Sequence, residues 1–259
     1  MGTRFAVRLT RAAIVVAVLA CSIGESQAAF IRVGVLPDFG NNAVAEIFSS
    51  GDLTGTATTL DVASFNALSV ADLRASYDVL YIPWLSGAAA NLDWTTRVLP
   101  YLQAGGGVVF EDPDSVGQLA PAVIGAVAEN GAGNLVITAN VPGLTDGIDP
   151  STFANTHIAF SSWIAGFFPF MVDTSNGNTV GLYSTAFGGH IVLTGPDQNF
   201  HSRRGSNQYQ FEIQEIQFAS AGAPLTVTPA PPSLILAVVG FGMVGLGGMR
   251  RRLSALRFR

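Results

Sequence analysis

The residues best suited to chemistry are polar side chains that each come directly after a predicted strand. The set is Asp38, Trp84, Glu111, Asp112, Asp114 and Asp197. In open parallel sheets, ligands bind outside the carboxyl ends of the strands, so we expect these side chains to share one edge. Carboxylate oxygens on loops suit a hard divalent cation such as calcium. The candidate metal ligands are Asp38, Asp112, Asp114 and Asp197. The alternative is that such acids cap the next helix.

Histidine offers one candidate for acid–base chemistry. His201 follows Asp197 and therefore belongs to the same edge, whereas His190 begins a predicted strand and lies at the opposite edge. A surface hydrolase would use His201 with a carboxylate such as Asp112. No serine stands in a Gly-x-Ser-x-Gly context, and Gly105-Gly106-Gly107 lacks the Lys-Ser/Thr of a phosphate-binding loop. We therefore assign no catalytic residue and no organic cofactor.

Alternating strands and helices must position these side chains. The predicted strands are residues 30–36, 56–62, 79–83, 108–110, 135–138, 180–183 and 190–194. The predicted helices are residues 41–50, 70–76, 93–103, 116–128 and 208–218. This alternation predicts a mostly parallel sheet with helices on both faces, a flavodoxin-like three-layer α/β sandwich.

An aromatic-rich stretch lies between two of these strands. Its members are Phe160, Trp163, Phe167, Phe168 and Phe170. Core packing or a hydrophobic flap is the main interpretation, because buried aromatic side chains dominate core energetics. A carbohydrate-binding or partner-binding surface is the alternative.

Four segments together resemble the class I glutamine amidotransferase-like superfold over residues 30–220. They are residues 32–36 (RVGVL), 78–83 (DVLYIP), 105–110 (GGGVVF) and 188–197 (GGHIVLTGPD). In active members of that family a cysteine nucleophile follows the third segment, where Asp112 stands here. A carboxylate cannot replace a thiolate in thioester chemistry, so the resemblance implies a domain without glutaminase activity.

The first 28 residues have the pattern of a secretory signal peptide. Arg4, Arg8 and Arg11 precede a short apolar core at residues 12–20, and Ser26-Gln27-Ala28 is a small-x-small cleavage site. We expect signal peptidase to cut after Ala28, and the domain at residues 29–220 to be exported.

The last residues have the pattern of a membrane anchor. A stalk at residues 221–232, rich in alanine and proline, leads to a predicted transmembrane segment at 233–252 and a cytoplasmic tail at 253–259. Its sixteen uncharged residues, Leu234 to Met249, span ~25 Å as a helix, close to the ~30 Å hydrocarbon core. The Arg250-Arg251-Arg252 cluster is expected to stay on the cytoplasmic side.

This tail also resembles the bacterial PEP-CTERM sorting signal, which an exosortase transpeptidase recognises. The resemblance assigns sorting roles to Pro229, Pro231, Pro232 and the Arg250–Arg252 cluster, although Ala230 stands where the family usually has glutamate. It implies a protein held in the inner membrane with its domain outside the cytoplasm. After processing, such a protein is found at the cell surface or outside the cell.

Charge and cysteine content argue against nucleic-acid binding and thiol chemistry. Residues 29–228 hold seventeen acidic residues and five arginines, a net charge of −12, and the chain has no lysine. Such a domain repels nucleic acid, so we expect no nucleic-acid partner. The single cysteine, Cys21, lies in the signal segment, which leaves the domain without a disulfide or a thiol nucleophile.

Together these features predict an exported surface or extracellular-matrix protein with a non-catalytic binding or structural domain. A surface polysaccharide is a candidate ligand. The alternatives are the surface hydrolase described above and a cation-dependent adhesin.

Overall fold

The computed structural model describes residues 29–37, 43–83, 92–111, 128–131, 134–153, 157–196 and 198–222. All of them belong to one compact unit, Met1–Pro224, and the second unit, Leu225–Arg259, contains no described residue. The predicted signal peptide, the predicted transmembrane segment and the sorting residues therefore lie outside the described residues. Within the described ranges, no helix is long and apolar enough to cross a membrane.

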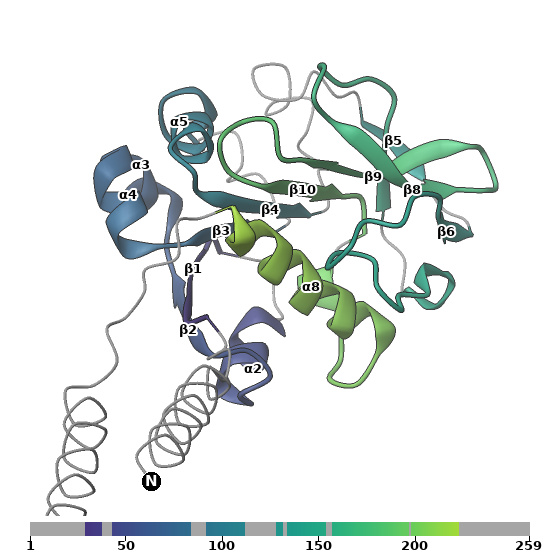
Figure 1. The fold of residues 1–259 in the computed structure, drawn as a ribbon, viewed down its shortest axis with the longest axis horizontal. Helices are drawn as coiled ribbons and strands as arrows, with labels where there is room; N and C mark the ends of the chain where they lie inside the picture. Colours follow the sequence, from purple (N-terminus) through teal and green to yellow (C-terminus); the bar gives the residue numbers. More distant parts are fainter. Residues whose placement is uncertain are drawn as a thin grey trace, which may run out of the picture. The chain divides into compact units, whose positions relative to one another are not determined.

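Five parallel strands form the first half of the sheet. They are β1 (Ile31–Val35), β2 (Gly55–Thr59), β3 (Val79–Ile82), β4 (Gly107–Glu111) and β10 (Ile191–Thr194). Their order is β2-β1-β3-β4-β10, and each neighbouring pair is parallel. Numbered along the chain this is the 2-1-3-4-5 order of flavodoxin-like folds, so the predicted strand order is confirmed (Figure 1).

Five further strands extend the sheet beyond β10. They are β5 (Ala128–Gly131), β6 (Leu135–Ile137), β7 (His157–Phe160), β8 (Phe168–Asp173) and β9 (Asn178–Ser184). All their pairings are antiparallel, so the prediction of a mostly parallel sheet was wrong for this half. The reason is local, because a four-residue turn with Gly177 at φ +77° joins β8 to β9. A connection that short can join only antiparallel strands.

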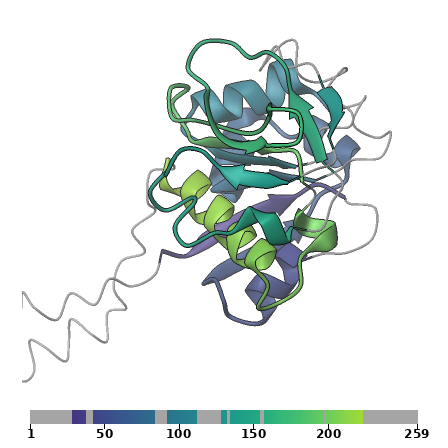
Figure 2. The ribbon, with the colours of Figure 1, turned by 90° about the vertical axis from the view of Figure 1, so that its right-hand side faces the viewer.

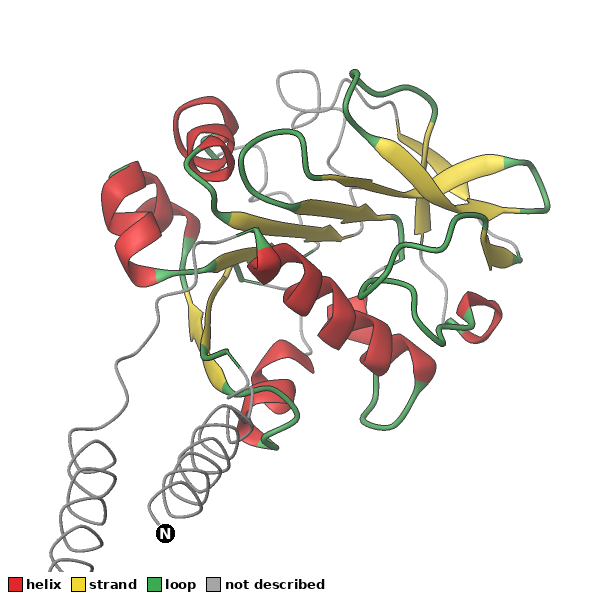
Figure 3. Ribbon diagram, in the orientation of Figure 1, coloured by secondary structure: helices red, strands yellow, loops and turns green. Residues whose placement is uncertain are grey.

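Helices cover both faces of the parallel half, as Figures 2 and 3 show. One layer holds α3 (Val62–Ala67), α4 (Val70–Ser76), the π-helical turn η2 (Trp94–Val98) and α5 (Leu99–Gln103). The other holds α2 (Ala43–Ser49), α7 (Gln198–His201) and α8 (Asn207–Ala221), with the 3₁₀ turn η3 (Pro150–Thr152) packed near α8. The three-layer prediction is therefore confirmed.

Strand β3 shows how one strand serves both cores. Leu80 and Ile82 belong to the cluster under α3, α4 and α5, and Val79 and Tyr81 belong to the cluster under α2 and α8. All four side chains are buried, which is the pattern of a strand covered on both faces.

Acidic residues begin several of these helices. The Asp61 carboxylate accepts a hydrogen bond from Ser64 N at 2.8 Å, and Asp93 accepts one from Thr96 N at 2.9 Å. The hydroxyls of Ser64 and Thr96 also donate to these carboxylates, and they lower the pKa of each carboxyl group more than the backbone bonds do. The cap at Asp61 explains why the predicted strand at residues 56–62 was too long, since α3 begins at Val62. Likewise Ala221, assigned above to the stalk, is the last residue of α8.

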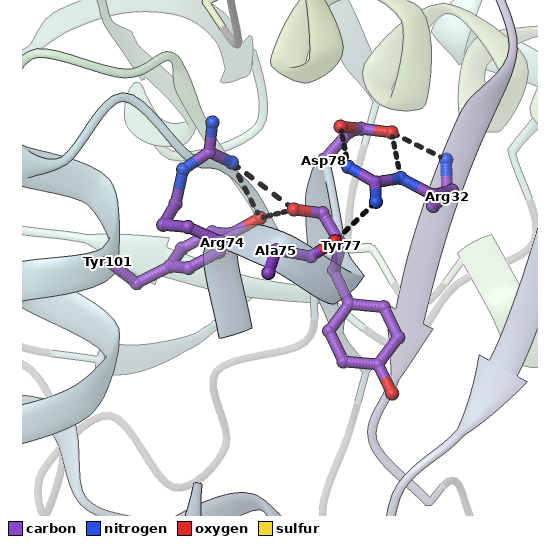
Figure 4. A network of polar contacts seen from close by, with 6 residues as sticks. All are labelled: Arg32, Arg74, Ala75, Tyr77, Asp78 and Tyr101. Carbon is purple, nitrogen blue, oxygen red and sulfur yellow. Dashed lines mark hydrogen bonds and ion pairs between the residues drawn. The ribbon is translucent and has the colours of Figure 1, made fainter. Parts of the chain in front are cut away.

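An arginine clamp joins β1 to β3 at the amino-terminal edge of the sheet (Figure 4). Arg32 donates from Nε and Nη2 to the two carboxylate oxygens of Asp78, at 3.0 and 2.7 Å, and its guanidinium also donates to the Ala75 carbonyl. The Asp78 bond holds the pKa of Arg32 above its usual value. Such bidentate pairs fix geometry better than single contacts do.

A second arginine, Arg74 of α4, lies at the same edge in the layer of α3, α4 and α5. Arg74 lies over the Tyr101 ring, 5.2 Å from its centroid, and the Tyr101 hydroxyl donates to the Tyr77 carbonyl at 3.1 Å. Two of the five domain arginines thus have structural roles at the edge opposite the expected ligand site.

Candidate functional site

Three buried glutamates meet beneath α8 near the carboxyl ends of the strands. Glu111 is the last residue of β4, and Glu212 and Glu215 lie three apart on α8, so they share one face of that helix. All three are fully buried, with 0% exposure. We call Glu111, Glu212 and Glu215 the glutamate cluster. It is the most unusual chemistry in the described part of the domain, because buried carboxylates are costly unless hydrogen-bonded.

Hydroxyl groups donate hydrogen bonds to the two glutamates of α8, although Glu215 Oε2 is buried without a hydrogen-bond partner among the described residues. Tyr81 Oη donates to Glu212 Oε1 at 3.1 Å, and Ser202 Oγ donates to Glu212 Oε2 at 2.7 Å. Thr194, at the end of β10, donates from Oγ1 to Glu215 Oε1 at 3.1 Å. These bonds connect α8 to two strands and to the segment after α7.

Asn199 connects the third glutamate to the helical layer. Its backbone N–H donates to Glu111 Oε2 at 2.9 Å, and its side-chain oxygen accepts from Val44 N at 3.2 Å. Glu111 therefore helps to hold both α7 and the start of α2 against the sheet.

Burial controls the protonation of this cluster. Removal from water raises the pKa of Glu215, hydrogen bonds with Glu111 and Thr194 oppose the rise, and the neighbouring Glu212 charge adds to it, so that the net pKa is about 8. Burial and the three carboxylates also raise the pKa of Tyr81 well above its usual value. Burial therefore favours the protonated form of Glu215.

The four predicted metal ligands, Asp38, Asp112, Asp114 and Asp197, lie outside the described residues, as does Trp84. The strands that precede them end at one edge, but β1 and β4 are separated by β3, which places their ends ~10 Å apart. Among the described residues, no group of three or more histidine, cysteine or acidic side chains has the arrangement needed to hold a metal ion. Calcium binding therefore stays a prediction.

The predicted acid–base residue, His201, is the last residue of α7 and is half-buried, with its ring edge-on to Phe200 at 4.8 Å. Its proposed partner Asp112 lies outside the described residues. His190 precedes β10 at the amino-terminal edge, where its Nδ1 lies 2.9 Å from the Phe218 carbonyl oxygen. The prediction that His190 lies away from the ligand edge is confirmed.

Sequence reasoning singled out Glu111 but missed Glu212 and Glu215. Both stand among the apolar residues Phe211, Ile213 and Ile216, which are also buried. Acids interleaved with apolar residues around a whole helix indicate burial on more than one side. The alternation of acidic and apolar residues at 211–216 was therefore the sequence signal that could have identified Glu212 and Glu215 as buried.

The aromatic stretch divides between core and surface. Phe160, Phe167 and Phe170 are buried, which confirms core packing for them, and Trp163 is half-buried. Phe168 is 53% exposed and departs from this pattern.

A polar groove of about 450 Å³ runs along α8 from the turn before its first residue to Gln217. Its lining residues are Asp52, Arg204, Gly205, Ser206, Tyr209, Gln210, Ile213 and Gln217. Asp52 accepts from Arg204 Nη2 and from Tyr209 Oη, both at 2.9 Å, and from Ser50 Oγ at 2.7 Å. These bonds lower the pKa of Asp52 to about 2. The charged groups of the groove therefore bind one another.

Comparison with known proteins gives a likeness in fold alone. No family model matches the sequence, and no curated protein matches it. A solved cytoplasmic protein of Salmonella typhimurium LT2 is 11% identical, with 74% of this chain and 98% of that chain covered and a TM-score of 0.50. A second cytoplasmic protein of Salmonella typhimurium is 11% identical, with 73% and 99% covered and a TM-score of 0.49. PurLQS from Thermotoga maritima is 10% identical, with 73% and 98% covered and a TM-score of 0.47.

Proposed function

We propose that this chain is an exported protein that a PEP-CTERM-like tail holds in the membrane until an exosortase-like enzyme processes it. Its glutamine amidotransferase-like domain then has a binding or structural role at the cell surface or in the extracellular matrix, without catalysis. Export is supported by the signal pattern at residues 1–28, and sorting by Pro229, Pro231 and Pro232 before an apolar stretch and Arg250–Arg252.

The burial of Glu111 carries the non-catalytic part of this proposal. In the family that the domain resembles, the nucleophile follows this strand, where this chain has Asp112 and no thiol. The described side chains around the strand ends are packed, not presented to substrate. Glu111, Thr194, Gln198 and Asn199 are each 0% exposed. Asn199 N donates to Glu111 and Thr194 Oγ1 donates to Glu215, so these buried groups support a structural role for this edge among the described residues.

We expect no glutaminase activity. The purified chain in mild detergent should release ammonia from glutamine no faster than buffer does, because thioester formation needs a thiolate. The matched control is Cys21→Ala in the uncleaved chain, since Cys21 is the single cysteine of the sequence and lies in the predicted signal peptide. Turnover that survives Cys21→Ala and disappears with one substitution in the domain would show that the domain is an enzyme.

We also expect the Arg250–Arg252 cluster to hold the tail in the membrane. Replacing all three by glutamine should move most of the protein from the membrane fraction to the medium, since an arginine costs ~2.5–3.5 kcal/mol at the centre of a membrane helix and resists translocation. The control replaces Arg257 and Arg259, which lie beyond the cluster. Mass spectrometry of the released chain should give Ala29 as its first residue. Identical fractionation of both variants and the native chain would disprove the anchoring role.

A further inference from the structure

We propose that a row of aromatic rings near the carboxyl end of α8 rests on the membrane that carries the tail. The row consists of Phe168, Tyr183, Phe218 and His190, and we call it the aromatic row. Its occupant is the boundary between the head groups and acyl chains of a zwitterionic lipid layer. This inference rests on the membrane tail of the proposed function and adds an interaction surface to it.

The four rings are continuous. The Phe168 and Tyr183 centroids are 5.7 Å apart, those of Tyr183 and Phe218 are 5.9 Å apart, and those of Phe218 and His190 are 4.9 Å apart. They come from three separate elements, since Phe168 begins β8, Tyr183 lies in β9 and Phe218 lies in α8. A row assembled from distant segments has a fixed shape.

The row is open to solvent at its outer end. Phe168 is 53% exposed and the next residue, Pro169, is also exposed, whereas Tyr183, Phe218 and His190 are half-buried. Phe170, two residues further along the same strand, is fully buried against Tyr183 and Phe211. The exposed Phe168 ring therefore extends an aromatic core outward and is not part of it.

The aromatic row lies beside Gly222, where the predicted stalk leaves the domain. Ala219 packs against Gly107 at the start of β4, and a side chain at Gly222, the last described residue, would meet His190. α8 thus ends at the amino-terminal edge of the sheet (Figure 1). The exposed Phe30, immediately before β1, belongs to the same edge.

The tether is short compared with the domain. Eleven residues, 223–233, separate Gly222 from the apolar stretch, and they can span at most about 40 Å. A domain of this length is itself about 40 Å across. Surfaces beside the attachment point are therefore the ones that meet the membrane most readily.

The chemistry of the row suits a lipid interface. Tyrosine and similar amphipathic rings favour the head-group level, with an apolar body and a polar tip. The net charge of −12 disfavours attraction to anionic lipids, so apolar contact must supply the binding. These features select a zwitterionic surface.

The test places tryptophan probes in the full chain, reconstituted in phosphatidylcholine vesicles with brominated acyl chains. Phe168→Trp reports on the aromatic row, and its exposed site tolerates the larger ring. Val136→Trp is the matched control, because Val136 is 37% exposed on β6 and pairs with Val172 near the other end of β8. After subtraction of the native tryptophan signal, we expect bromine to quench the probe at 168 at least twofold more than the probe at 136.

Each contrary result has its own meaning. Equal quenching of the two probes in chains that float with the vesicles would overturn the membrane contact and leave the anchoring intact. Chains that fail to float would overturn the proposed anchoring, and this inference with it. A blue shift of the 168 probe that grows with protein concentration in detergent would assign the row to a second copy of the chain instead.

Discussion

Raising the pH from 5 to 8 should lower the free energy of unfolding by about 3 kcal/mol, and Glu215→Gln should remove most of that loss. The folded state raises the pKa of Glu215 from 4.5 to about 8, because the group is buried. Proton binding therefore favours the folded state. The stabilisation is complete below pH 4.5 and disappears as the pH rises through about 8, with a slope of at most ~1.4 kcal/mol per pH unit.

Urea unfolding of the detergent-solubilised chain at pH 5, 6.5 and 8 measures this effect. Glu46→Gln is the matched control, since Glu46 is exposed on α2 and the same substitution there should leave the slope unchanged. Glu215→Gln keeps the shape of the side chain but cannot ionise. If it retains the native pH slope, the glutamate cluster is not the group that titrates.

Gly189→Ala should cost more than about 4 kcal/mol, enough to prevent stable folding. A Cβ atom at residue 189 would overlap the carbonyl oxygen of Gly106 and would lie 3.0 Å from that of Leu102. Both atoms are backbone, so no side chain can move aside. The turn before β10 would have to leave the end of α5, and β10 carries Thr194 to the glutamate cluster.

Gly143→Ala is the matched control for this prediction. Gly143 has φ +78°, and a Cβ there would meet no atom within 4 Å, so its cost is the ~1–2 kcal/mol of a left-handed backbone. Thermal unfolding should show a shift of a few degrees for Gly143→Ala and no cooperative transition for Gly189→Ala. Equal shifts would mean that the turn can move away from α5.

The sequence predicted the parallel half of the fold because most of its strands are compact apolar runs that alternate with helical patterns. Val79–Ile82 and Ile191–Thr194 are buried along their whole length and show it clearly. The antiparallel half was harder to predict. β8 begins with an exposed Phe168 and Pro169, so it lacks the alternation that identifies a half-buried strand. The sequence therefore showed that residues 160–170 are rich in aromatic side chains, but it did not show that Phe168–Asp173 form a strand.

Only Glu111 of the glutamate cluster could be located from the sequence, because the burial of ionisable residues on a helix is not visible there. Strand ends are visible in a sequence, and Glu111 was placed correctly at one. Glu212 and Glu215 were counted as part of an acidic surface, because ionisable residues are almost always exposed unless paired. Only the packing of α8 against β3, β4 and β10 shows that both lie inside.

The position of the tether also has a mechanical consequence. Gly222 leaves the domain at the amino-terminal edge, whereas a ligand of an open parallel sheet is held at the carboxyl ends of the strands. A pull between the two would stretch the sheet along its strands. The hydrogen bonds that join β4 to β10 and β3 run across the strands, so they would resist the force together rather than break one after another. Loading of the strands in shear would suit the surface role proposed above, in which the domain joins a cell to a ligand.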